Sequence, residues 1–79
     1  MPEQSTRDRV CKAVGVILAV HPNDVKDTDD LVDDYGADSL DGVEILIELE
    51  DEFRIQIRDE DFERCNTIKD LIDLMERLT

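Results

Sequence analysis

The sequence predicts an all-α fold, a four-helix bundle of three main helices and one short helix, with a long loop after the first helix. Apolar residues recur at the three- and four-residue intervals of amphipathic helices, and residues suited to capping helices precede them. The one alternating stretch, Ile55-Gln56-Ile57, is too short for a strand and has no evident partner, so it is predicted to be an extended link. The 79 residues suffice for a single domain, residues 1–79, and not for two.

The first helix is predicted to begin after Ser5, an N-cap residue followed three positions later by Asp8. Its apolar face comprises Val10, Val14, Ile17 and Leu18. The segment His21-Pro22 is expected to stop it, because proline disfavours helical backbone at the preceding residue. A connection from about residue 22 to 38 follows, which is longer than most loops. The side chains expected to attach this loop to the core are Val25, Leu31, Val32 and Tyr35.

Three further helical segments follow a turn that Gly36 permits. The second helix is capped by Asp38 or Ser39 and runs to about Phe53. A short turn begins at residues 59–61 and directs Phe62 inward. Thr67 caps the last helix, whose apolar face comprises Ile68, Leu71, Ile72, Met75 and Leu78. The predicted core is the inward faces of these helices: Val10, Val14, Ile17, Leu18, Ile45, Leu49, Phe53, Ile68, Leu71, Ile72 and Met75.

The second helix carries apolar residues on two opposite sides. At about 100° per residue, Ile45, Leu46, Leu49 and Phe53 share one side. The other side carries an outward stripe of Leu40, Val43 and Ile47, bordered by the acids Asp41, Glu44 and Glu48. Either the helix is buried on both sides, or the outward stripe is exposed and forms a docking surface for basic partners.

The net charge of −13 is concentrated in one segment. Fourteen acidic and two basic residues lie between Asp29 and Asp61, so this segment carries −12. Such acidity argues against nucleic acid and anionic membrane surfaces as partners. The N-terminal residues contain no secretory or membrane-spanning apolar run, so a cytoplasmic monomer with reduced, structural cysteines is expected. Cys11, Cys65 and His21 lack metal-ligand spacing, and no metal site is predicted.

Ser39 stands where the long loop meets the second helix. A serine at this place is often only a helix cap. A nucleophilic role is improbable, because the segment is no G-x-S-x-G elbow and the single histidine, His21, lies in another segment next to Pro22. An EF-hand calcium loop also fails, since aligning Gly36 with its invariant glycine places Leu31 and Gly42 at ligand positions. No enzymatic activity is predicted.

Three consecutive segments carry a resemblance: Gly36-Ala37-Asp38-Ser39-Leu40-Asp41, Val43-Glu44-Ile45 and Leu49-Glu50-Asp51-Glu52-Phe53. Together they resemble the acyl carrier proteins, whose attachment signature Asp38-Ser39-Leu40 matches. The resemblance covers nearly the whole chain and implies the acyl-carrier four-helix bundle. It also implies that Ser39 receives 4′-phosphopantetheine from coenzyme A through a phosphopantetheinyl transferase, with Asp38 belonging to the recognition signature.

The resemblance further implies a discrete carrier that holds acyl intermediates as thioesters for partner enzymes. Its recognition helix corresponds to the six residues found above from helix geometry: Leu40, Asp41, Val43, Glu44, Ile47 and Glu48. Fatty acid biosynthesis is the expected pathway, with polyketide or another specialised acyl synthesis as an alternative, because Gly42, Tyr35 and Arg58 depart from the common pattern. Gly42 faces inward and makes an expandable apolar pocket plausible. The alternative of another class is an unmodified acidic helical interaction module.

Overall fold

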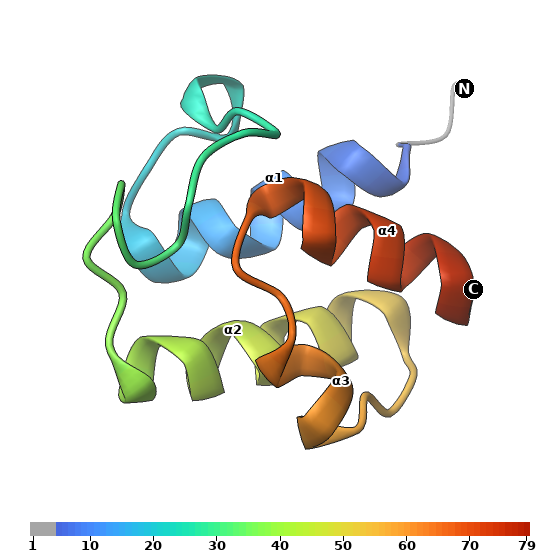
Figure 1. The fold of residues 1–79 in the computed structure, drawn as a ribbon. Helices are drawn as coiled ribbons and strands as arrows, with labels where there is room; N and C mark the ends of the chain where they lie inside the picture. The colour runs from blue at the N-terminus through green and yellow to red at the C-terminus, as the bar shows by residue number, and fades with distance from the viewer. Residues whose placement is uncertain (1–4) are drawn as a thin grey trace.

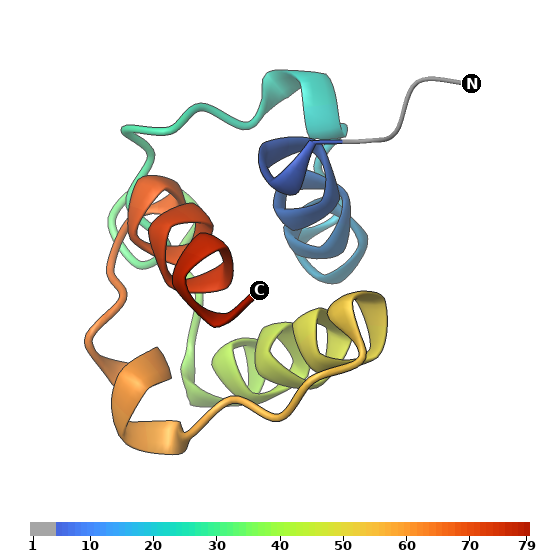
Figure 2. The same cartoon turned by 90° about the vertical axis from the view of Figure 1, so that its right-hand side faces the viewer.

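The computed structural model describes residues 5–79 and is all-helical over that range. In chain order it contains α1 (Thr6–Leu18), the 3-10 helix η1 (Pro22–Asp24), α2 (Ser39–Phe53), α3 (Asp59–Glu63) and α4 (Ile68–Leu78) (Figure 1). Helices α1, α2 and α4 surround a common core, and α3 lies beside α2 on the side of α4 (Figure 2). Within the described residues, an isolated antiparallel bridge joins Asp30 to Thr67. The predicted fold class is confirmed.

Side-chain caps set the starts of the three main helices. Ser5 Oγ accepts a hydrogen bond from the Asp8 N–H at 3.1 Å. In α2 and α4 the cap is reciprocal. The side chain of the N-cap residue, Asp38 in α2 and Thr67 in α4, accepts a hydrogen bond from the backbone N–H three residues later. The side chain of that later residue, Asp41 or Asp70, accepts one from the N–H of the N-cap residue. These predicted helix starts are therefore confirmed, and Asp38, not Ser39, is the cap of α2.

Helix α1 ends earlier than the proline predicts. Its last residue is Leu18, and Ala19 adopts the left-handed conformation with φ 58°. The Val20 N–H then donates to the Gly15 carbonyl oxygen at 3.0 Å. A Cβ at Gly15 would lie 2.4 Å from the Val20 oxygen, so this tight ending requires glycine there. Pro22 instead begins the 3-10 helix that follows.

The core follows the predicted faces with three corrections. Leu74 is buried at 4% exposure, whereas Leu78, predicted to face inward, is 37% exposed at the end of α4. Val32, predicted to attach the loop, is 63% exposed. Ile17 and Leu18 are only partly buried. The fully or nearly buried apolar residues include Val10, Val14, Val25, Leu31, Ile45, Leu49, Phe53, Ile57, Ile68, Leu71, Ile72 and Met75.

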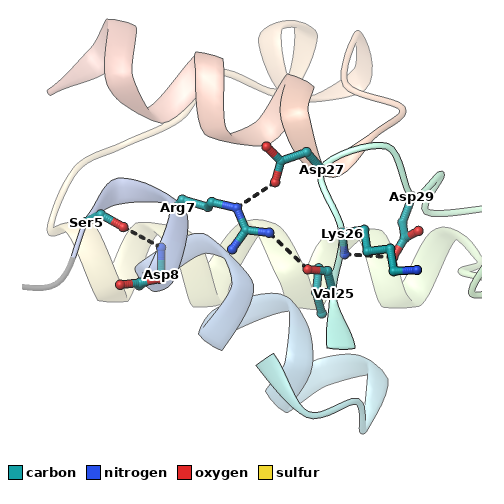
Figure 3. A network of polar contacts seen from close by, with 7 residues as sticks. All are labelled: Ser5, Arg7, Asp8, Val25, Lys26, Asp27 and Asp29. Atoms are coloured by element: carbon teal, nitrogen blue, oxygen red, sulfur yellow. Dashed lines mark hydrogen bonds and ion pairs between the residues drawn. The ribbon is translucent and has the colours of Figure 1, made fainter. Parts of the chain in front are cut away.

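Polar contacts attach the long loop to α1. Arg7 Nε lies 2.7 Å from Asp27 Oδ1, and Arg7 Nη2 donates to the Val25 carbonyl oxygen at 3.2 Å (Figure 3). Farther along, the Lys26 N–H donates to Asp29 Oδ2 at 2.9 Å, and the Tyr35 hydroxyl donates to the same carboxylate. Of these side chains only Tyr35 was expected to attach the loop, and its hydroxyl bonds to Asp29 of the loop itself.

Backbone hydrogen bonds attach the same loop to the start of α4. The Ile68 N–H donates to the Asp29 carbonyl oxygen, and the Lys69 N–H donates to the Asp27 carbonyl oxygen. In the other direction, the Leu31 N–H donates to the Asn66 carbonyl oxygen at 2.9 Å. The Ile68 and Lys69 N–H groups belong to the first turn of α4 and lack helical partners, so the loop carbonyls satisfy them. The loop is therefore fixed where it leads into α2.

Candidate functional site

The turn before α2 places Ser39 at the first position of the helix. Gly36 has φ 64°, a left-handed conformation that glycine adopts without strain, which confirms the predicted turn. The Gly36 N–H donates to the Val32 oxygen at 2.8 Å, and the Ala37 N–H donates to the Leu31 oxygen at 3.0 Å. The chain then enters α2 through Asp38, so the geometry of Ser39 is set by a hydrogen-bonded turn and a capped helix.

Asp38 leaves the Ser39 hydroxyl free of the capping role. Asp38 Oδ1 accepts from the Asp41 N–H at 2.9 Å, and Asp41 Oδ2 accepts from the Asp38 N–H at 3.2 Å. Ser39 itself is exposed. The interpretation of Ser39 as only a helix cap is therefore wrong. The serine presents an accessible hydroxyl at the positive end of a 15-residue helix, where a phosphate group is electrostatically favoured.

The outward stripe is exposed over its whole length. Leu40, Val43 and Ile47 are 64%, 52% and 51% exposed, while Ile45 and Leu49 on the opposite side are buried. Glu44 beside the stripe is exposed, and Asp41 and Glu48 are partly exposed. The alternative in which α2 is buried on both sides is therefore wrong. An apolar strip bordered by carboxylates lies directly beside Ser39.

A cavity of about 470 Å³ opens next to Ser39, between α2, α3 and the end of the long loop. That volume lies within the range of small-molecule pockets in proteins. Its apolar lining includes Ile45 and Leu46 of α2 and Phe62 of α3, and Gly42 faces into it as the sequence predicted. Ser39 and Asp38 lie among its lining residues, so a group attached to the serine would lie beside an apolar space.

The sequence pattern did not place Val32 at this site, and it placed Phe62 there only in part. Val32 is exposed and lines the cavity from the loop, although it was predicted to attach the loop to the core. An apolar residue within the acidic run Asp29–Asp34 was the available signal. Phe62 was predicted to face inward, but the pattern did not show that it faces the glycine of α2.

The two cysteines are not activated as nucleophiles. Burial raises the pKa of the Cys65 thiol to about 11, and burial also raises the pKa of Cys11. A thiol with a raised pKa is mostly protonated at neutral pH and reacts slowly. Both cysteines are free. Within residues 5–79, no three His, Cys, Asp or Glu side chains are grouped to hold a metal ion. The helices that the structure describes are all too short or too polar to cross a membrane.

The fold and site define a helical carrier, with an accessible serine at a helix start, an apolar cavity beside it and an acidic exposed face. The phosphopantetheine attachment site family matches residues 8–75. The chain is 42% and 41% identical over 73 residues to acyl carrier proteins of Chlorobium luteolum and Chlorobium phaeovibrioides, covering 92% of this chain and 94% of each relative. The chain belongs to the acyl carrier protein family.

A solved structure from Mycobacterium tuberculosis, provisionally described as an acyl carrier protein, is similar to this fold with a TM-score of 0.87. The match covers 95% of this chain and all of that one, at 28% identity. The family is defined by an attached 4′-phosphopantetheine group, and its members are non-enzymatic carriers. An unmodified interaction module, the alternative of another class, is therefore disfavoured.

Proposed function

We propose that the protein is a discrete acyl carrier protein whose phosphopantetheine is attached to Ser39. The observation that carries this proposal is the accessible Ser39 hydroxyl at the start of α2, with the capping role taken by Asp38. The attached group supplies a terminal thiol that holds acyl chains as thioesters. The phosphate becomes a diester of the serine oxygen, next to the backbone N–H groups of the first turn.

Asp38 is proposed to contribute to recognition by the transferase, with coenzyme A as the donor. It is exposed and precedes Ser39 directly, and its carboxylate is held in place by the Asp41 N–H. The position of the carboxylate beside the serine is therefore fixed before the transferase binds. The cavity that Ser39 borders is proposed to receive the apolar part of the acyl chain.

The outward stripe and its acids are proposed to bind the transferase and the acyl-transferring enzymes. Leu40, Val43 and Ile47 supply apolar contact area, and Asp41, Glu44 and Glu48 supply charge complementary to basic docking patches. We propose that the protein works as a monomer in the cytoplasm. This location is supported by two free cysteines, which are usual in a reducing compartment.

The proposed pathway is fatty acid biosynthesis, with polyketide or another specialised acyl synthesis as the alternative. The cavity supports the first, since its apolar lining suits a saturated chain better than a polar one. The acyl group found on the protein purified from its source distinguishes these pathways, because its mass differs between a saturated chain and an oxygenated one.

Intact mass tests the attachment. The apo protein is incubated with coenzyme A and a phosphopantetheinyl transferase, and the expected result is a gain of one phosphopantetheine. The Ser39→Ala variant should gain nothing. Ser5→Ala is the matched control, because it removes a serine from another helix start and should be modified like the wild type. No gain in the wild type, or a gain in Ser39→Ala, overturns the proposal.

A further inference from the structure

Phe62 of α3 is among the residues that line the cavity opposite α2. Gly42 of α2 faces α3, and a Cβ placed there would lie 3.9 Å from Cε2 of Phe62. No other atom outside the glycine's own neighbourhood lies within 4 Å of that position. At this point α2 therefore meets α3 as a glycine facing an aromatic ring. The space between the two helices depends on the side chains at these two positions.

We propose that Gly42 and Phe62 together set the length of the acyl chain that the cavity shelters. The inference rests on the proposed function, because an arm attached at Ser39 is what brings an acyl chain to the cavity. Ser39 and Gly42 both lie in the first turns of α2 and both line the cavity, as does Phe62. A chain held in this cavity would therefore lie against both residues.

The element that carries Phe62 is lightly held. Helix α3 has five residues, its N-cap Arg58 makes no side-chain cap hydrogen bond, and none of its residues is buried. An isolated helix this short has little stability of its own. Its C-terminal end is held by the Cys65 N–H, which donates to the Phe62 oxygen at 2.9 Å. Phe62 packs against the core but is only partly buried there, and in this proposal its ring moves away from Gly42 when a chain enters.

Charge restricts which acyl groups use this space. Asp38 borders the cavity at the start of α2, and Asp59 and Glu63 border it from α3. A carboxylated acyl group entering here would meet three carboxylates and an apolar lining, and both disfavour it. The cavity should thus shelter uncharged chains and leave carboxylated ones in water.

The test measures how well the protein protects a thioester. A transferase loads wild-type and variant apo proteins with butanoyl-, octanoyl-, dodecanoyl- or malonyl-phosphopantetheine from the corresponding coenzyme A, and intact mass confirms loading. Hydroxylamine cleavage is then followed by mass, and the rate is compared with that of the free acyl-pantetheine. Each methylene withdrawn from water favours the sheltered form about fourfold.

We expect Gly42→Leu to reduce protection of the octanoyl thioester roughly fifteenfold, the effect of returning about two methylenes to water. Butanoyl and malonyl thioesters should be cleaved at similar rates in every variant. Asp51→Leu is the matched control, because Asp51 is exposed on the same helix and does not line the cavity. It should protect the octanoyl thioester within about twofold of the wild type. Phe62→Ala should increase protection of the dodecanoyl thioester relative to the wild type, because the smaller side chain leaves room for a longer chain.

The outcomes separate this inference from the proposed function. Absence of loading in the wild type contradicts the attachment at Ser39. Normal loading with equal octanoyl protection in the wild type and Gly42→Leu overturns the role of Gly42 and leaves the carrier function standing. If Gly42→Leu does not fold, Gly42→Ala provides the test. Its methyl group fits against the ring, and octanoyl protection should fall about two- to fourfold.

Discussion

Replacing Gly15 with alanine should destabilise the protein, although the same change stabilises most helices. Alanine is favoured over glycine within a helix by up to about 1 kcal/mol. At Gly15, however, the added Cβ would lie 2.4 Å from the Val20 carbonyl oxygen, a separation that the backbone must relieve by moving. Both the Ala19 and Val20 N–H groups donate to the Gly15 oxygen, so the movement disturbs the hydrogen bonds that end α1.

The size of the effect follows from these opposing contributions. Weakening two backbone hydrogen bonds costs about 1 kcal/mol each. After the gain in helix propensity, the free energy of unfolding should fall by about 1–2 kcal/mol. For a domain of this size, that loss lowers the Tm by roughly 5–15 °C.

Gly42→Ala provides the matched comparison, because the added Cβ there makes an ordinary contact at 3.9 Å. It should raise the free energy of unfolding by about 0.5–1 kcal/mol. Urea unfolding of the two apo variants, followed by far-ultraviolet circular dichroism, measures both free energies of unfolding. If Gly15→Ala proves as stable as the wild type, or more so, the steric account of the end of α1 is wrong.

Three other predictions concern charge. The pKa of Asp70 is lowered because two backbone N–H groups at the start of α4 donate to its carboxylate. The stability that this carboxylate confers is therefore present at neutral pH and lost as the pH falls below about 4. In urea titrations the stability difference between the wild type and Asp70→Asn should shrink below that pH, and a constant difference would contradict this. Arg9→Ala should cost about 1–2 kcal/mol, because the guanidinium lies 4.1 Å from the Phe53 ring centroid and contacts Glu52 across the α1–α2 interface. Arg9→Lys should recover only part of this loss, and a stability of Arg9→Lys equal to that of the wild type would argue against a geometric role. Glu44→Lys should slow association with a basic partner enzyme in stopped flow and weaken its salt dependence, and an association rate insensitive to salt in the wild type would refute steering by charge.

The sequence predicted the helices well because their determinants are local. The starts at Ser5, Asp38 and Thr67 depend on a cap and the residue three positions later, and both are visible in the sequence. The existence of the outward stripe followed from 3.6-residue periodicity, which left its burial or exposure open, and the structure shows that it is exposed. These features required no knowledge of distant contacts.

The loop and the helix ends were predicted less well because they depend on distant neighbours. Val32 is exposed although apolar, since the backbone bonds of the loop to α4 decide which way each side chain points. Periodicity also assigned a face to Leu78 without showing how far along α4 the neighbouring helices reach. Likewise, the tight ending at Ala19 arises from one contact between Gly15 and Val20 that no spacing rule reveals. The attachment of phosphopantetheine at Ser39 remains a prediction.

The division of labour between Asp38 and Ser39 bears on how a carrier can serve many enzymes in turn. Because the first turn of α2 is completed by Asp38 and Asp41, adding or removing a group on the serine breaks no hydrogen bond of the capping box. The apo, holo and acylated forms would then share the same backbone at the start of α2, and each enzyme would meet the same helix start. The order in which enzymes act would then be decided by the attached acyl group and not by the shape of this helix start.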